Sequence, residues 1–494
     1  AGPGPRAAPR SPPRRAGAAT TISAPVSTRE GLRTAVNAVA GDEQAGREKP
    51  ALSALGGDVQ APKADGSSGE QRERAEAFFT QKAGGRSSVY SLGDDADPDT
   101  AAWAAAADGS GAEAAKPKKP GKGKGKGKGK EAPAPVPDPV YPARTIVFNG
   151  VEFPATAFRP DRPTGELIVR AINAAKTSID ISVYEFKNRE ILKALREAKA
   201  RGVKIRVIVD FGNTFPSKRD DSTYWPSRSL ELQSMLSEGF DVTISRGIEK
   251  WGISHNKVAV FDGAFALAGS YNWSFTSEDN HFENLFFTDD KKNIAGLQAY
   301  WEYLRALSVP FDQAKAHAWP QTAPTPPRDA SPSVVLNGVS LPSYVFSPDS
   351  YAEDTVVKAL DAAKKSIDVS MFTLTSPRVV RALAAAKDRG VKVRVLVDQS
   401  QHDEDFMKPF VDWLAFQGIP VKVNAGPNVD GPEWAEKNHN KFAVLDGKLV
   451  LSGSTNWTKS GFYTNFDNIF MLTDATDVKG FVMFFDDMFK SRRA

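Results

Sequence analysis

The sequence predicts an α/β protein made of two homologous βαβ-type domains packed about a pseudo-twofold axis, preceded by a disordered N-terminal segment. Three observations support this: an internal repeat, β-rich runs alternating with amphipathic helical patterns, and a front segment rich in Ala, Gly, Pro and Ser. A chain of 494 residues is long enough for roughly two to four domains. We expect the disordered segment over 1–142, the first domain over 143–325 and the second over 326–494.

The N-terminal segment 1–142 has weak apolar periodicity, which is typical of disordered chain. It ends, over 116–142, in alternating Lys-Gly followed by a Pro-rich stretch, a composition that predicts a flexible cationic tether and a stiffer spacer. Two interpretations stay open: a soluble linker, or electrostatic attachment of this tether to an anionic surface. The net charge of +4 arises in this segment, and the rest of the chain is balanced.

Composition also excludes several classes of protein. No stretch approaches 18 uninterrupted apolar residues, so we expect no transmembrane helix. Cysteine is absent, which excludes disulfides, thiolate catalysis and Cys-based zinc sites. The first residue is Ala rather than Met, as expected after removal of a signal peptide or trimming of the chain. We expect a monomeric protein that is secreted or held in the cell envelope.

Three segments of the first half recur in the second half at one common offset of 188 residues. Such a long period indicates two homologous domains rather than a solenoid. The matching segments are 147–158 with 335–346, 174–186 with 362–374, and 191–210 with 379–398.

Each copy alternates strand and helix patterns. Ile179–Val183 is a short β-rich run, and the next segment has apolar residues at helical spacing up to Gly202, a helix-terminating signal. A second β-branched run follows and ends at Asp210, as its repeat ends at Asp398. Strand–helix–strand units of this kind predict a buried, largely parallel sheet with ligands at the carboxyl ends of the strands.

A polar pattern appears once in each copy, and it carries the chemistry. Residues 254–274 read SHNKVAVFDGAFALAGSYNWS, and 438–458 read NHNKFAVLDGKLVLSGSTNWT. A carboxylate followed by Asn comes further along each copy. The chain has only five histidines, so two matched copies of this pattern are improbable by chance. The paired candidates are His255 with His439, Lys257 with Lys441, Asp262 with Asp446, Ser270 with Ser454, Asn272 with Asn456, and Glu283 with Asp467.

Strand alternation explains why these residue types are grouped. His255 and Lys257 are two apart, so they share one face of a strand. The Asp-Gly pair that follows predicts a tight hairpin, whose return strand brings Ser270 and Asn272 to the same region. An imidazole, a cation, an amide and a hydroxyl placed together suit a phosphate diester.

The pattern resembles the HxKx4Dx6GSxN signature of the phospholipase D superfamily, and the resemblance covers 143–494. It implies that the two halves pack about a pseudo-twofold axis and contribute one histidine each to a single active site. One histidine then attacks phosphorus to form a phosphohistidine, and the other protonates the leaving alcohol and activates water. We assign His255 as the nucleophile, because two-domain relatives usually use the N-terminal copy, and His439 as the general acid/base. The duplication leaves the reverse assignment open.

The resemblance also implies roles for the remaining candidates. The lysines and asparagines bind the non-bridging phosphate oxygens, the serines donate further hydrogen bonds to the substrate, and the carboxylates orient the imidazoles. The strand pattern places Asp262 and Asp446 at the hairpin turns, where a structural role is expected. No metal or cofactor is expected, because the lysines and asparagines supply the positive field. The other histidines are not expected to be ligands: His281, His317 and His402.

The substrate is less constrained than the chemistry. The first copy resembles the endonuclease and cardiolipin-hydrolase branch, whose members act on nucleic acid or on phospholipid. Three hypotheses follow: a phospholipid headgroup hydrolase, a metal-independent nuclease, and a phosphatidyl transferase or non-catalytic binding protein. The balanced charge of 143–494 favours lipid or a small diester, whereas the Lys-Gly tether leaves nucleic acid open. Aromatic residues in two unrepeated segments either hold acyl chains, stack on bases or belong to the core: Phe215, Tyr224, Trp225, Trp251, Phe406, Phe410, Trp413 and Trp434.

Overall fold

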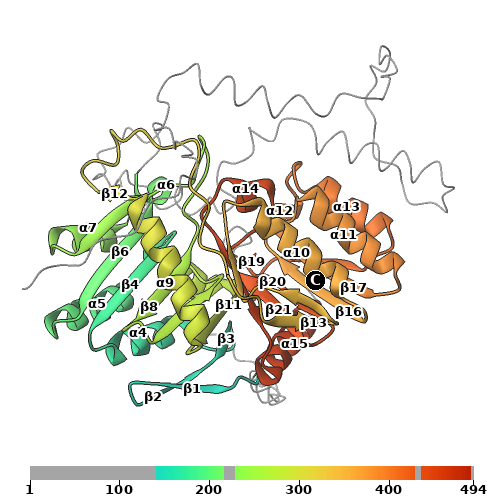
Figure 1. The fold of residues 1–494 in the computed structure, drawn as a ribbon, viewed down its shortest axis with the longest axis horizontal. Coiled ribbons are helices and arrows are strands. Elements are labelled where there is room, and N and C mark those ends of the chain that lie inside the picture. The colour runs from blue at the N-terminus through green and yellow to red at the C-terminus, as the bar shows by residue number, and fades with distance from the viewer. Residues whose placement is uncertain (1–140, 216–228, 429–435, 491–494) are drawn as a thin grey trace, which may run out of the picture. The chain divides into compact units, whose positions relative to one another are not determined.

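The computed structural model describes residues 141–215, 229–428 and 436–490, in which two large sheets are each covered by helices (Figure 1). The predicted disordered segment, apart from its last two residues, and the whole Lys-Gly run lie outside the described residues. Within the described ranges, no helix combines the length and the apolar character that crossing a membrane requires.

The first large sheet contains the first copy of the motif. Its strands are β3 (Thr156–Arg159), β4 (Ser178–Val183), β6 (Lys204–Asp210), β7 (Asp241–Ser245), β8 (Lys257–Phe261), β9 (Phe265–Gly269), β11 (His281–Thr288), β12 (Val309–Pro310) and β19 (Lys437–Asn438). Their order is β12-β7-β6-β4-β8-β9-β11-β19, and β3 pairs with β11.

This sheet is mixed, so the prediction of a largely parallel sheet was wrong. Strands β4, β6 and β7 are parallel, whereas β8 is antiparallel to β4, and β9 and β11 continue antiparallel. The reason is connectivity. Helical crossovers join the parallel strands, while a tight turn joins β8 directly to β9 and forces an antiparallel pair. The sequence predicted the strand–helix–strand unit and the hairpin separately. It did not predict that the hairpin strands join the same sheet.

The second large sheet repeats this arrangement in the order β15-β22-β21-β20-β16-β17-β18. Parallel pairing joins β16, β17 and β18, and antiparallel pairing joins the others. Its strands are β15 (Tyr344–Phe346), β16 (Ser366–Met371), β17 (Lys392–Asp398), β18 (Val421–Asn424), β20 (Lys441–Leu445), β21 (Leu449–Gly453) and β22 (Asn468–Leu472).

Helices cover both faces of each sheet. On the first sheet they are α4 (Thr164–Ala174), α5 (Arg189–Ala200) and α7 (Leu230–Ser237) on one face, and α9 (Lys291–Ala306) on the other. On the second sheet they are α10 (Ser350–Ala362), α11 (Pro377–Asp388) and α13 (Lys408–Phe416) on one face, and α15 (Ala475–Lys490) on the other.

The two halves share apolar cores. The core beneath α9 includes Tyr344 and Phe470 of the second half, and the core beneath α15 includes Phe158 of the first half. Burial of these large side chains therefore holds the halves against each other. Shorter elements complete the fold: β1 (Thr145–Phe148), β2 (Val151–Pro154), β5 (Phe186–Lys187), α6 (Phe211–Thr214), β10 (Trp273–Ser274), α8 (Phe275–Asn280), β13 (Val334–Leu336), β14 (Val339–Leu341), α12 (Gln399–His402) and α14 (Lys459–Tyr463).

The turns predicted from glycine and Asp-Gly in the sequence are present in the structure. Gly202 and its repeat Gly390 both have φ of +87°, a conformation that favours glycine after the end of a helix. At the motif hairpin, Asp262 and Gly263 have φ of +53° and +61°, as a type I′ turn requires. The Asp262 carboxylate accepts hydrogen bonds from the backbone N–H groups of 176–178, at the far end of β8 from His255. Asp446 does the same in the second half.

We expect Asp262→Ala to lower the free energy of unfolding by about 2 kcal/mol, because it leaves several loop N–H groups without their charged acceptor. Asp262→Asn, which keeps one carbonyl acceptor and tolerates positive φ, should cost less. Urea unfolding measures both, and activity per folded molecule should stay unchanged. A stable Asp262→Ala variant with lost activity would contradict a purely structural role.

Candidate active site

The two motif histidines come from different halves and are each tied to the opposite half. His255 precedes β8, and its backbone N–H donates to the Phe466 carbonyl at 2.9 Å. His439 precedes β20, and its N–H donates to the Phe282 carbonyl at 3.0 Å. Both side chains are almost completely buried. The duplication thus produces a reciprocal interface, in which equivalent residues exchange equivalent contacts.

The carboxylates hold the histidines in a crossed arrangement. His255 Nδ1 lies 2.9 Å from Asp467 Oδ1, and His439 Nδ1 lies 2.8 Å from Glu283 Oε1. Each imidazole is therefore oriented by the carboxylate of the other half. The shorter Asp467 side chain reaches its histidine as well as Glu283 does. Burial would raise the pKa of Glu283, but the charge of His439 and the hydrogen bonds from His281 and His439 outweigh it and hold the pKa at about 2.

Asparagines repeat this crossing beneath the histidines, and our sequence reasoning gave them no role. Asn284 Nδ2 donates to Asn440 Oδ1 at 2.9 Å, and Asn468 Nδ2 donates to Asn256 Oδ1 at 2.8 Å. All four are buried. The signal in the sequence was the identical HNK in both copies and the Asn after each carboxylate. Each pair gives two buried amides a partner in the opposite half, so these contacts favour this docking of the halves.

The motif lysines are buried cations beside the histidines. Lys257 Nζ donates to the His255 carbonyl at 3.0 Å and lies 5.0 Å from the centre of the Tyr184 ring. Lys441 Nζ donates to the His439 carbonyl at 2.9 Å and lies near the Phe372 ring in the same way. Each lysine thus has a defined position next to its own histidine. The prediction that both share a face of one strand was wrong, because β8 and β20 begin at the lysines and the histidines precede them.

The serines contact carboxylates in this structure, whereas we expected them to contact substrate. Ser270 Oγ donates to Glu283, and Ser454 Oγ donates to Asp467 Oδ1 at 2.6 Å. The preceding Gly453 permits this close approach of the strands, because a Cβ there would lie 2.0 Å from the Asn468 carbonyl oxygen. A direct contact between serine and substrate stays a prediction. The structure supports a role in holding the carboxylate.

Each motif asparagine has one buried amide atom that no described residue satisfies. Asn456 Oδ1 accepts the Thr373 N–H at 3.3 Å, and its buried Nδ2 finds no hydrogen-bond partner among the described residues. In the first half, Asn272 Oδ1 is buried without a partner in the same described part of the chain. Because unpaired buried polar atoms are rare, these amides are well suited to receive a polar ligand.

Asp210 and Asp398, at the carboxyl ends of β6 and β17, support the loops that carry the histidines. Asp210 Oδ1 accepts the Ser254 N–H at 2.8 Å, and Asp398 Oδ2 accepts the Asn438 N–H at 2.8 Å. Both carboxylates are completely buried. Burial raises the pKa of both, that of Asp210 to about 6.

The pKa of Asp210 predicts a pH-dependent stability. Exposed aspartate has a pKa near 3.9, so the folded state retains a proton that the unfolded state releases between about pH 4 and 6. The free energy of unfolding should therefore fall as the pH rises through this window. Asp210→Asn removes the effect, and between pH 4 and 7 its stability relative to the parent should improve by about 3 kcal/mol. Urea unfolding at several pH values measures this, and a constant difference would contradict it.

His281 enters the site although its position outside the motif gave no reason to expect this. Its Nδ1 lies 3.4 Å from Glu283 Oε1 and 3.3 Å from Ser277 Oγ. Its ring centre is 5.5 Å from that of His439. Burial lowers the pKa of His281, which favours the neutral imidazole. The spacing of His281 and Glu283 in the sequence is too common to identify a site residue. His281 approaches His439 only because the two halves pack together.

The aromatic residues considered for substrate contact divide into three groups. Three are buried in the apolar cores, in agreement with the alternative that they are core residues: Phe215, Phe410 and Trp413. Two are half-buried, with Phe406 packed against a core and Trp251 beside Lys250. The others lie outside the described residues: Tyr224, Trp225 and Trp434.

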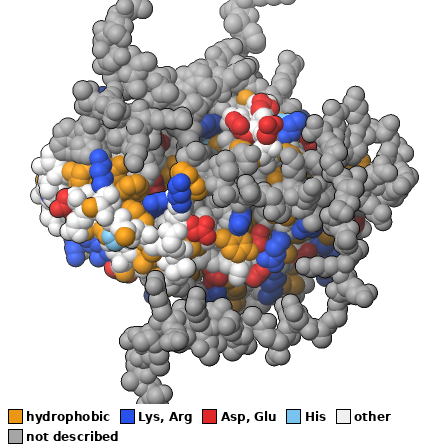
Figure 2. Space-filling model, turned by 90° about the horizontal axis from the view of Figure 1, so that it is seen from above, with side chains coloured by type: hydrophobic (Ala, Val, Ile, Leu, Met, Phe, Trp, Pro, Cys, Tyr) orange, Lys and Arg blue, Asp and Glu red, His pale blue; other side chains and the backbone are white. Residues whose placement is uncertain are grey.

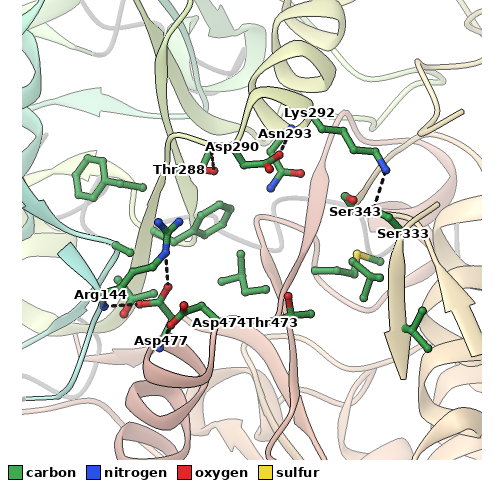
Figure 3. A pocket seen from close by; sticks show the side chains of 18 residues that line it. Arg144, Thr288, Asp290, Lys292, Asn293, Ser333, Ser343, Thr473, Asp474 and Asp477 are labelled. Carbon is green, nitrogen blue, oxygen red and sulfur yellow. Dashed lines mark hydrogen bonds and ion pairs between the residues drawn. The ribbon is translucent and has the colours of Figure 1, made fainter. Parts of the chain in front are cut away.

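A cavity of about 580 Å³ lies elsewhere, where β11 and β22 end and α9 and α15 begin (Figure 3). Both basic lining residues already have carboxylate partners: Arg144 Nε lies 3.3 Å from Asp477, and Lys292 lies 2.8 Å from Asp329 outside the lining. The candidate catalytic residues are not among its lining residues. We therefore take the crossed histidines, and not this cavity, as the candidate active site.

Comparisons with known proteins agree with this geometry. A family model described as "Cardiolipin synthase, PLD-like domain" matches residues 168–305 and 356–489. Mitochondrial cardiolipin hydrolase of Xenopus laevis is 33% identical over 130 residues, which cover 26% of this chain and 56% of that protein. The chain thus spans about half the length of such relatives. Phospholipase D Z of Dictyostelium discoideum is 26% identical over 356 residues, which cover 61% of this chain and 78% of that protein.

Among solved structures, a phospholipase D family member, Nuc from Salmonella typhimurium, matches with 27% identity and a TM-score of 0.27, covering 29% of this chain and 91% of that one. The family model accounts for more than half of the chain and matches it twice, once in each half. Together with the duplicated, crossed histidine site, this match shows that the chain belongs to the phospholipase D superfamily.

Proposed function

We propose that this chain hydrolyses the headgroup phosphodiester of phospholipids through a covalent phosphohistidine, with His255 as the nucleophile. The observation that carries the proposal is the crossed pairing of each histidine Nδ1 with a buried carboxylate. An imidazole that donates Nδ1–H to a carboxylate is held in the tautomer whose Nε2 can attack phosphorus or transfer a proton. Two such imidazoles at one interface provide a nucleophile and an acid/base.

The first step forms the phosphoenzyme. Nε2 of neutral His255 attacks phosphorus as the bond from phosphorus to the headgroup oxygen breaks. His439, protonated at this stage and stabilised by Glu283, gives its Nε2 proton to the leaving alcohol. In the second step neutral His439 takes a proton from water, the water oxygen attacks phosphorus, and the P–N bond breaks. Phosphatidic acid leaves, and both histidines return to their starting states.

Hydrogen-bond donors of the protein can stabilise the negative charge that develops on the non-bridging oxygens of the phosphate. Lys257 and Lys441 lie in buried positions beside the two histidines. The unsatisfied Nδ2 of Asn456 adds a donor on the second half. The unpartnered atom of Asn272 is the acceptor Oδ1, so Asn272 is assigned by its equivalent position in the motif, with its amide Nδ2 as the donor. Fixed donors in a water-poor site stabilise a transition state without reorganising. These four residues are therefore assigned to the phosphate oxygens.

The choice of lipid as substrate rests on the relatives and on charge. The curated relatives reported above are named as cardiolipin hydrolase and phospholipase D. Residues 143–494 are balanced in charge, and Figure 2 shows acidic and basic side chains interspersed on the face in view. A nuclease is expected to present a more continuous basic footprint over its folded part.

A substrate panel in excess EDTA tests the proposal, with His255→Ala as the blank. It compares phosphatidylcholine, phosphatidylglycerol and cardiolipin vesicles with single- and double-stranded DNA and RNA. We expect release of phosphatidic acid and headgroup from at least one lipid, and phosphatidylethanol when ethanol competes with water. Cleavage of nucleic acid while lipids stay intact would overturn the lipid assignment. Turnover that persists in the blank would overturn the mechanism.

A further inference from the structure

The candidate active site departs from its own symmetry at a buried histidine. His281 in the first half corresponds to Asn465 in the second, two residues before the carboxylate in each copy. Asn465 Oδ1 accepts the backbone N–H of Ile253 at 3.2 Å, so it serves a loop. His281 instead directs Nδ1 towards Glu283, and its buried Nε2 has no partner among the described residues. Only the Glu283–His439 pair therefore has a second imidazole.

We propose that His281, Glu283 and His439 form an inhibitory site for a late first-row divalent cation, of which Zn²⁺ and Co²⁺ are the best candidates. Each residue offers one ligand atom, and the three atoms lie within 4.8 Å of one another. Zn–N bonds of about 2.0–2.1 Å imply ligand atoms about 3.3 Å apart in a tetrahedron. The contacts of Glu283 Oε1 with the two Nδ1 atoms, 2.8 and 3.4 Å, need only small shifts to reach that spacing.

The donor set determines the class of ion. Two imidazoles and one carboxylate suit Zn²⁺, Co²⁺, Ni²⁺ or Cu²⁺, whereas Mg²⁺ and Ca²⁺ prefer oxygen ligands. All three side chains are more than nine-tenths buried, so few water molecules compete for the ion. Lys437, which pairs with His281 across β11 and β19, repels a bound cation. The carboxylate of Glu283 neutralises one of the two positive charges of the ion. A site of moderate affinity is therefore expected, as suits reversible inhibition.

Binding of the ion would interfere with the acid/base residue directly. The metal takes Nδ1 of His439, which now faces Glu283, so the carboxylate no longer orients this imidazole. The positive ion also disfavours a proton on Nε2 of the same ring. Inhibition is therefore expected for any diester substrate. The prediction of inhibition rests on the proposed function. Binding itself does not depend on it.

The test is a titration of the EDTA-treated, desalted full chain with Co²⁺, followed by visible absorption. We expect one Co²⁺ per chain with the intense bands of low-coordinate cobalt, displaced by Zn²⁺. His281→Asn, which copies the residue of the second half, should weaken Co²⁺ binding at least about tenfold. His402→Asn is the matched control, because His402 contacts Asp403 and Asp412 at a more exposed place and should leave binding unchanged.

Two further measurements guard against a misfolded variant. Zn²⁺ should raise the thermal unfolding temperature of the parent more than that of His281→Asn, and circular dichroism should show the same fold for both. With a chromogenic diester, Zn²⁺ should inhibit the parent at concentrations at least about tenfold lower than the variant. Absence of Co²⁺ binding, or binding lost only in His402→Asn, overturns the site. Co²⁺ binding by a chain without diesterase activity would retain the site and reject the proposed function.

Discussion

Replacement of His255 by Ala is expected to lower kcat/KM for a phosphodiester by at least about 10⁴-fold, because no other group takes over as nucleophile. His439→Ala should cost about 10²–10⁴-fold, the range for a general acid/base. Both side chains are buried and held by a carboxylate of the opposite half. Removal of either leaves that carboxylate without its partner, so folding must be checked by circular dichroism alongside activity.

A substrate with a good leaving group separates the two roles. Bis(p-nitrophenyl) phosphate releases p-nitrophenolate without needing a proton, so His439→Ala should still form the phosphoenzyme but fail to hydrolyse it. Mass spectrometry of the denatured chain, kept out of acid, should then show one p-nitrophenyl phosphoryl group, bound through a P–N bond, on the peptide that contains His255. His255→Ala should show no adduct at all.

His317→Ala changes an exposed histidine and should retain full activity. An adduct on the peptide of His439 would reverse the assignment of nucleophile and acid/base. Activity that survived in a chain lacking both motif histidines would reject the phosphohistidine mechanism.

The second large effect concerns the carboxylates, and it follows from the crossing of the halves. Asp467→Asn should impair the nucleophile His255, although the two residues are in different copies of the motif. Glu283→Gln should impair the acid/base His439. An amide in place of the carboxylate favours the wrong tautomer and no longer stabilises an imidazolium, so losses of about 10⁴-fold are expected.

Detection of the covalent adduct by mass spectrometry tests which carboxylate serves which histidine. Asp467→Asn should slow formation of the adduct, as His255→Ala does. Glu283→Gln should permit formation and slow its decay, as His439→Ala does. Glu278→Gln is the matched control, since Glu278 contacts Gly165 and Arg159 and neither motif histidine. If Asp467→Asn slowed only decay, each carboxylate would serve the histidine of its own half, contrary to the structure.

Much of the architecture was predictable from local patterns. The internal repeat predicted two related halves, and the family model matches each half separately. Glycine after the helices and Asp-Gly in the hairpin predicted turns that the φ angles of Gly202, Gly390 and Asp262 match. These features depend on residues close together in the sequence, where steric rules for φ and strand alternation apply directly.

The sequence by itself thus determined that two copies of a His, Lys and Asn set exist, and the twofold repeat implied a shared site. Only the tertiary structure decided which carboxylate serves which histidine, that the serines hold those carboxylates, and that His281 joins one pair alone. It also showed Phe410 and Trp413 to be core residues. The physical reason is that these contacts form between segments far apart in the chain, through packing of two faces. No local spacing encodes which side chains will meet there.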